Sequence, residues 1–139
     1  MIHKVISAFS ICDYPFWPFH YQSPELSLYI RMPPDIPPEI ETTTQSLDEA
    51  MTACPAISNI TIHHRLRGQG LFAELQTALL ALTPVKALCI TTVANERLRL
   101  HLSRNPNWQP LHHIHRVDPI PGNCRDFYRL SPEMRLTTS

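Results

Sequence analysis

The stretch that decides the fold is Ile60-Thr61-Ile62-His63-His64-Arg65-Leu66-Arg67-Gly68-Gln69-Gly70-Leu71-Phe72. Its first residues are apolar or β-branched, which is typical of a strand, and we expect that strand over residues 57–63. Two glycines then mark a turn over residues 66–70. The apolar residues after the turn recur with the spacing of one helix face, at Leu71, Phe72, Leu75, Ala78, Leu79 and Leu82. The stretch therefore predicts strand, glycine turn and amphipathic helix in direct succession, with the helix ending before Thr83-Pro84.

A glycine turn that opens a helix can hold an anion. The first amides of a helix have no partner within it, and the aligned peptide dipoles add positive potential there. Such an end binds phosphate readily. Gly68 and Gly70 let the backbone approach an anion closely, and Arg67 can add a charge-assisted hydrogen bond. There is no Gly-Lys-Ser/Thr sequence, so a nucleotide-hydrolysing phosphate loop is not expected. The alternative is a turn whose glycines serve only packing.

The segment Arg67-Gly68-Gln69-Gly70-Leu71-Phe72 resembles motif A of the GNAT N-acetyltransferase superfamily, Arg/Gln-x-x-Gly-x-Gly/Ala, with Phe72 in place of the last small residue. A second register, over residues 65–70, matches the letters better. We prefer the first because family members usually carry Arg-Gly-x-Gly followed by an apolar residue. The resemblance implies that backbone amides of this turn hold the pyrophosphate of acetyl-coenzyme A. The coenzyme-binding set that it implies is Ile62, His63, Arg67, Gly68, Gln69, Gly70, Leu71, Phe72 and Asn95.

The resemblance continues downstream, over about residues 57–130. The apolar, β-branched segment 85–93 is placed where the family's fifth strand splays from the fourth, so that the pantetheine arm inserts between them. Residues 95–104 alternate like a strand, but a cap at Asn95, Glu96 in the first turn and good helix formers favour a helix. Leu98 and Leu102 would pack this helix. Trp108 resembles an aromatic of the family. We expect two last strands, at 111–117 and 124–130, joined by a hairpin over 118–123.

Taken together, the pattern predicts one α/β (α+β) domain over residues 1–139. The resemblance implies a mostly antiparallel central sheet, splayed between the family's strands 4 and 5 and flanked by helices. It also implies that residues 57–130 form the acetyl-coenzyme A-binding core. Residues 1–56 form a shortened, proline-rich part, in which loops replace the family's two early helices. Within it we expect strands at 4–11 and 26–31, and a short helix at 47–53. Ser46 and Glu49 have the spacing of a capping box for that helix.

The catalytic residues are less evident. Family members often use a glutamate or an ordered water as base and a tyrosine as acid, but Leu102 stands where that tyrosine is expected and residues 57–63 contain no acid. His63, His101 and Tyr128 are the remaining candidates for a proton carrier, with solvated side chains as the alternative reading. An aromatic set near the N-terminus forms either an acceptor wall or a cover for the sheet: Tyr14, Phe16, Trp17, Phe19 and Tyr21.

The function that these features predict is transfer of an acetyl group from acetyl-coenzyme A to an amine of a small molecule or protein. The alternative is a catalytically degenerate relative that engages a protein partner, or a structural component of an assembly. A homodimer is also compatible with the sequence.

Several classes are disfavoured by composition. The chain has 12 basic and 12 acidic residues, which gives no reason to expect nucleic acid or a membrane surface as partner. We expect Cys12, Cys54, Cys89 and Cys124 to be free thiols of a cytoplasmic protein, because they form no disulfide-scaffold pattern and the N-terminus lacks a signal-peptide core. His113 and His115 make an incomplete zinc site without a further ligand, so no metal is expected.

Overall fold

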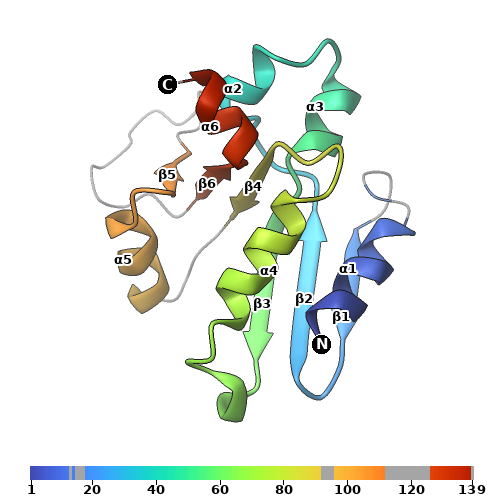
Figure 1. Cartoon of the computed structure of the whole chain (residues 1–139), viewed down its shortest axis with the longest axis vertical. Helices are drawn as coiled ribbons and strands as arrows, with labels where there is room; N and C mark the ends of the chain where they lie inside the picture. Colours follow the sequence, from blue (N-terminus) through green and yellow to red (C-terminus); the bar gives the residue numbers. More distant parts are fainter. Residues whose placement is uncertain (13, 15–17, 92–95, 112–125, 139) are drawn as a thin grey trace.

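In the computed structural model, residues 1–12, 14, 18–91, 96–111 and 126–138 are described. They form a six-stranded sheet in the order β1-β2-β3-β4-β6-β5 (Figure 1). Only β3 and β4 pair in parallel, and the other neighbours are antiparallel. The fold class predicted from the sequence, a mostly antiparallel sheet flanked by helices, is confirmed. The strands are β1 (Phe19–Gln22), β2 (Leu26–Arg31), β3 (Ala56–Ile62), β4 (Ala87–Ile90), β5 (Gln109–Pro110) and β6 (Phe127–Leu130).

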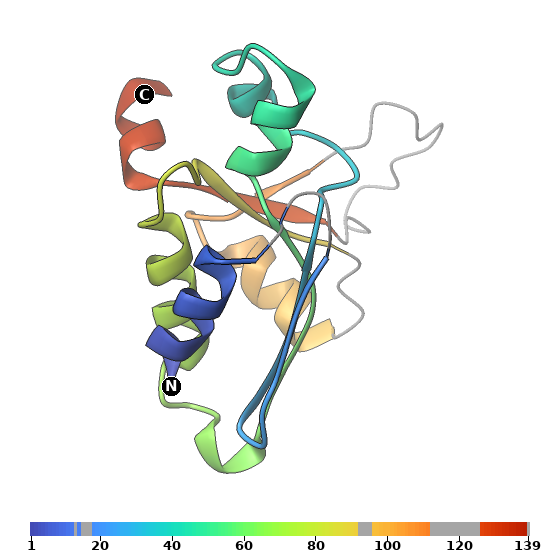
Figure 2. The ribbon, with the colours of Figure 1, turned by 90° about the vertical axis from the view of Figure 1, so that its right-hand side faces the viewer.

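Helices cover both faces of this sheet. One core cluster unites the strands with α1, α4 and α5, and α1 and α4 lie side by side over the strands (Figures 1 and 2). A second cluster unites β4 and β6 with α2, α3 and α6. The helices are α1 (Ile2–Ser10), α2 (Pro38–Glu41), α3 (Leu47–Ala53), α4 (Leu71–Leu80), α5 (Glu96–Arg104) and α6 (Pro132–Thr138). No helix among the described residues has the length and apolar character needed to cross a bilayer.

Strand β4 separates the two clusters. Leu88 and Ile90 belong to the cluster with α4, while Ala87 and Cys89 belong to the cluster with α3. This follows from the two-residue repeat of a strand, whose successive side chains point to opposite faces. All four residues are buried, as expected for a central strand covered on both faces.

A β-bulge interrupts the pairing of β2 and β3. Tyr29 pairs with Asn59 and Ile30 with Ile57, so Ser58 is an extra residue on β3. The bulge resets the alternation of side chains. Ile57, Ile60 and Ile62 consequently all contact the cluster on the α4 face, although their spacing in a regular strand would divide them between two faces.

Most of the expected elements are present. The strand before the turn, the helix after it and the helix at 96–104 are confirmed, as are β2 and α3. The Ser46 cap is confirmed, since Ser46 Oγ accepts from the Glu49 amide at 3.1 Å. The Glu49 carboxylate accepts from the Gln45 amide, also at 3.1 Å, one residue before the position that a capping box requires. Strand 85–93 is observed as the shorter β4 (Ala87–Ile90). Of the two last expected strands, 124–130 is observed in part as β6, which pairs with Gln109 and Pro110 of β5. Residues 112–125, which include the expected hairpin over 118–123 and nearly all of the strand at 111–117, lie outside the described residues.

The strand expected at residues 4–11 is wrong, because this segment is helix α1. Its buried residues are Ile2, Val5 and Phe9, whose spacing of three and four places one stripe against the core. The proline-rich segment also differs from the expectation. It contains α2 in addition to the expected α3 between β2 and β3, so two helices precede the glycine turn there. They occupy a connection between two neighbouring antiparallel strands.

Candidate functional site

The glycine turn leads from β3 through a short 3₁₀ helix (His64–Leu66) into α4. Gly68 and Gly70 have φ angles of +80° and +74°, a region that side chains other than glycine rarely adopt. A Cβ atom built on either glycine would meet no atom within 4 Å. The backbone of the turn therefore faces open space, as a site for an external group requires.

The first amides of α4 have no acceptor among the described residues. The first hydrogen bond of the helix runs from the Glu74 amide to the Gly70 carbonyl, at 2.9 Å. Gly70 is the N-cap and supplies no side-chain acceptor. The amides of Leu71, Phe72 and Ala73 therefore remain available at the positive end of a ten-residue helix.

Two polar side chains stabilise the turn. Arg67 Nε donates to the Ile62 carbonyl at 3.0 Å, and Gln69 Nε2 donates to the Arg65 carbonyl at 3.3 Å. The first bond holds the Arg67 guanidinium against the end of β3. No partner in the described part of the chain engages its terminal nitrogens, which leaves them able to bind an anion.

Before this turn, β3 is paired with β4 over a short length only. The two strands pair only at Ala56 with Cys89 and at Ile57 with Ile90. The Thr91 amide makes one further bond to the Ile57 carbonyl, at 3.0 Å. Residues 58–62 of β3 continue without a described partner on that side, toward the glycine turn (Figure 1). The described pairing ends at Ile57 and Ile90, and the chain that follows Thr91 lies outside the described residues. We use the word gap for the edge of residues 58–62 on the β4 side, which has no described partner; its closed end lies at Ile57 and Ile90 and its open end at the turn.

A buried hydroxyl lies at the closed end of this gap. Thr91 is 2% exposed, and its Oγ1 has no hydrogen-bond partner among the described residues. Buried polar groups are normally bonded, so this hydroxyl is available to a group that enters between the strands.

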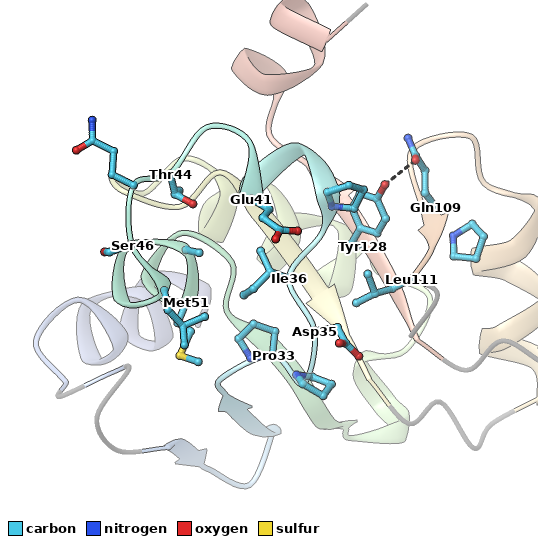
Figure 3. A pocket seen from close by; sticks show the side chains of 16 residues that line it. Pro33, Asp35, Ile36, Glu41, Thr44, Ser46, Met51, Gln109, Leu111 and Tyr128 are labelled. Atoms are coloured by element: carbon cyan, nitrogen blue, oxygen red, sulfur yellow. Dashed lines mark hydrogen bonds between the residues drawn. The ribbon is translucent and has the colours of Figure 1, made fainter. Parts of the chain in front are cut away.

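A separate pocket of about 890 Å³ lies between the α2–α3 segment and the β5–β6 pair (Figure 3). Tyr128 forms part of its wall, and the strand register places this residue beside Cys89 of β4. Cys89 in turn pairs with Ala56, one residue before the last paired position of β3. The pocket wall therefore lies close to the closed end of the gap, on the sheet face opposite α4.

Tyr128 belongs to a hydrogen-bonded group of three side chains. Its hydroxyl oxygen lies 2.9 Å from Glu39 Oε1 and 2.9 Å from Gln109 Oε1. A hydroxyl has one proton, and the carboxylate is the stronger acceptor for it. Burial, followed by the hydrogen bond to Glu39, raises the pKa of Tyr128 above its ordinary value. Tyr128 therefore stays protonated at neutral pH and serves as a hydrogen-bond donor.

The two candidate histidines lie away from this group. His63 follows β3 at the glycine turn, is exposed, and accepts a hydrogen bond from the Arg65 amide at Nδ1, at 3.2 Å. Its ring packs on His64 with centroids 4.3 Å apart. His101 is exposed in the last turn of α5, next to the fully buried Leu102. The structure thus places His63 at the glycine turn, with the other described residues that the sequence predicts to bind the coenzyme, but does not bring His63, His101 and Tyr128 to one place.

Other sequence-based candidates are placed as follows. Asn95 lies outside the described residues, as do Phe16, Trp17, His113, His115 and Cys124. Tyr14 and Tyr21 pack against the cluster on the α4 face, and Phe19 is buried in it, so these three cover the sheet. Cys12, Cys54 and Cys89 are free. A hydrogen bond with Cys54, followed by burial, raises the pKa of Cys89, which argues against a thiolate nucleophile there.

Sequence reasoning did not identify Glu39. Glu39 lies in a proline-rich segment with no local motif, and it meets Tyr128 across 89 residues of chain. A carboxylate that follows two prolines gives no signal of such a contact. Only the path of the α2–α3 connection brings the two residues together.

Comparison with known proteins finds a likeness to a solved structure. No family model matches the chain, and no curated protein sequence matches it. The crystal structure of AtaTR bound with AcCoA is similar with a TM-score of 0.42 and 12% sequence identity, over 86% of this chain and 72% of that chain.

Proposed function

We propose that the protein binds acetyl-coenzyme A at the glycine turn and transfers its acetyl group to an amine. One observation carries the proposal. The free amides at the start of α4 stand at the open end of the gap between β3 and β4. An anionic pyrophosphate fits the first feature, and an extended arm with amide groups fits the second.

The dimensions support this arrangement. Residues 58–62 of β3 span about 17 Å at the rise of a strand. That length is comparable with an extended pantetheine arm. A coenzyme whose pyrophosphate is bound at the turn would then carry its thioester to the closed end of the gap, near Ile57, Ile90 and the Thr91 hydroxyl. The bulge at Ser58 lies at the same place, and bulges often adjoin functional sites because they disturb regular pairing.

The reaction requires few groups from the protein. The lone pair of a neutral amine attacks the thioester carbonyl carbon, a C–N bond forms, and the C–S bond then breaks. The nitrogen loses a proton and the leaving thiolate gains one, which gives an amide and free coenzyme A. Positioning of the two substrates and polarisation of the carbonyl supply most of the rate in this assignment.

The assignment gives the candidate residues different roles. His63 would lie at the phosphate end of the coenzyme, about six strand residues or roughly 20 Å from the thioester. It would contact the coenzyme rather than carry a proton for the reaction. Tyr128, kept protonated, would hold Glu39 in place as a positioning residue. Water is then the simplest proton acceptor for the amine, and His101 remains a candidate to be tested.

The test combines binding and turnover. Acetyl-coenzyme A is titrated by calorimetry, and release of free coenzyme A is followed with a panel of primary amines. His63→Ala should weaken coenzyme binding without abolishing turnover. A true general acid or base would instead lose about 10²–10⁴-fold in turnover with coenzyme binding intact. If His63→Ala or His101→Ala shows the second pattern, that histidine is the proton carrier.

A non-catalytic binding protein of the same fold is the second candidate. It is favoured by the hydrogen bond from the Tyr128 hydroxyl to Glu39 Oε1, because this bond already engages one oxygen of the carboxylate near the closed end of the gap. Tight binding of acetyl-coenzyme A without turnover on any amine would select this candidate. Absence of binding would reject both.

A further inference from the structure

We propose that the pocket between α2–α3 and β5–β6 is the acceptor site, and that it selects a small, positively charged amine with an apolar body. This rests on the proposed function for the reaction, but the selection of a cation stands on the pocket itself. The pocket and its labelled side chains are shown in Figure 3.

The position of the pocket suits an acceptor. Tyr128 contributes to its wall and lies next to Phe127, which pairs with Ile90 at the closed end of the gap. The glycine turn lies at the opposite end of the gap. An amine that binds there as the ammonium ion first loses one proton to water. The neutral amine then approaches the thioester from the sheet face opposite α4, without competing with the coenzyme phosphates.

The pocket has the size and walls of a small-molecule site. Its volume of about 890 Å³ lies within the range of ligand pockets. Apolar side chains from three segments line it, among them Ile36, Met51 and Leu111. Prolines on both sides of Ile36 restrict that part of the wall, so the pocket needs little ordering when a ligand binds.

The charged side chains among the described lining residues are all acidic, namely Asp35 and Glu41. Asp35 takes part in an interaction within the protein, so we assign the attraction for a cation to Glu41. Glu39 of α2 adds a carboxylate behind the wall: it is not a lining residue but is bonded to the lining residue Tyr128. Acidic groups at a concave, apolar surface focus a negative potential that attracts cations and repels anions.

Glu39 also has an unused acceptor. Its Oε2 is buried and has no hydrogen-bond partner within the described ranges. A buried carboxylate oxygen without a donor is costly, and its uncompensated negative charge, close behind Tyr128, adds to the attraction of the pocket for a cation. The Tyr128 hydroxyl holds the other oxygen, so the carboxylate is oriented before the ligand arrives.

The test measures amine binding without acetyl-coenzyme A. The probe is 2-phenylethylamine, with the neutral isostere 2-phenylethanol as its partner, each titrated by NMR into the full chain. The amine should bind at least about tenfold more tightly than the alcohol. Equal affinities, or no binding of the amine, would overturn the proposal.

Variants that remove one negative charge at a time show which carboxylates attract the amine. Glu39→Gln and Glu41→Gln keep the side-chain shape, and the amide introduced by Glu39→Gln retains an oxygen that can accept from Tyr128. Each variant should bind the amine about tenfold more weakly than the parent, and its affinity for the alcohol should be unchanged. Glu25→Gln is the control, because Glu25 is exposed at the turn between β1 and β2. Unchanged amine affinity in both pocket variants would contradict the role of the carboxylates.

The two proposals fail separately. If the amine binds as described but acetyl-coenzyme A does not bind at all, the cation pocket stands and the acetyltransferase assignment falls. If acetyl-coenzyme A binds and the amine does not, only the pocket proposal falls. A short peptide with a free, apolar first residue, titrated in the same way, distinguishes a protein N-terminus from a small-molecule amine as the source of the cation.

Discussion

The Tyr128 hydroxyl lies 2.9 Å from Glu39 Oε1, although the two residues are 89 positions apart in the chain. The contact links β6, the last strand along the chain, to α2, the first helix of the connection between β2 and β3. It closes one side of the pocket that we propose as the acceptor site. The stability of the connection and the shape of the pocket therefore depend on the same hydrogen bond.

Replacing Tyr128 by phenylalanine should destabilise the protein. Glu39 Oε1 and Gln109 would lose their partner while remaining near the pocket wall, at a cost of about 1–3 kcal/mol. Urea denaturation measures the free energy of unfolding. Tyr29→Phe is the matched control, since Tyr29 is half-buried on β2, and its change should stay within about 0.5 kcal/mol. Equal effects of the two variants would show that the Tyr128 contact contributes nothing.

Alkaline pH should reveal the raised tyrosine pKa values. Burial is the main cause for both Tyr14 and Tyr128, and in both it favours the protonated phenol in the folded state. Because the folded pKa is raised, their contribution to stability is complete below the ordinary tyrosine pKa of about 10 and falls as pH rises above it. Unfolding free energy should therefore decline above about pH 10, and more shallowly in Tyr128→Phe than in the parent. An identical pH dependence in the two proteins would contradict the raised pKa of Tyr128.

The charge at the glycine turn is tested by Gly70→Asp. This substitution places a carboxylate at the N-cap of α4, beside the proposed pyrophosphate site. Calorimetry should show that the affinity for acetyl-coenzyme A falls by roughly ten- to a hundredfold. Gly70→Asn is the matched control, because asparagine has the same shape without the charge and tolerates a positive φ. The asparagine variant should lose much less affinity. If both variants bind like the parent, the turn is not the site.

The choice between the two registers of the glycine motif is tested by two arginine variants. Arg67 is held against the Ile62 carbonyl at the end of β3, whereas Arg65 lies in the 3₁₀ helix before the turn. Arg67→Ala should lower the affinity for acetyl-coenzyme A by about tenfold, and Arg65→Ala should lower it by much less. The reverse order would favour the register over residues 65–70.

The features that the sequence predicts correctly are those set by neighbouring residues along the chain. The strand, turn and helix around Gly68 and Gly70 follow from short-range patterns, and so does the Ser46 cap of α3. The strand expected at residues 4–11 is wrong because a nine-residue helix with three buried positions, Ile2, Val5 and Phe9, has the same apolar character as a short strand. The pocket and its Glu39–Tyr128 contact could not be predicted, because they depend on how two distant segments meet across the sheet.

Direct observation of the glycine amides is the most decisive measurement. The chain contains three glycines, Gly68, Gly70 and Gly122, so protein labelled with ¹⁵N only at glycine gives a simple amide spectrum. The Gly70→Asn variant assigns one of the signals. If the turn holds the pyrophosphate, the Gly68 and Gly70 signals should shift strongly and saturably as acetyl-coenzyme A is added. Signals of Gly68 and Gly70 that stay in place at saturating acetyl-coenzyme A would contradict the account.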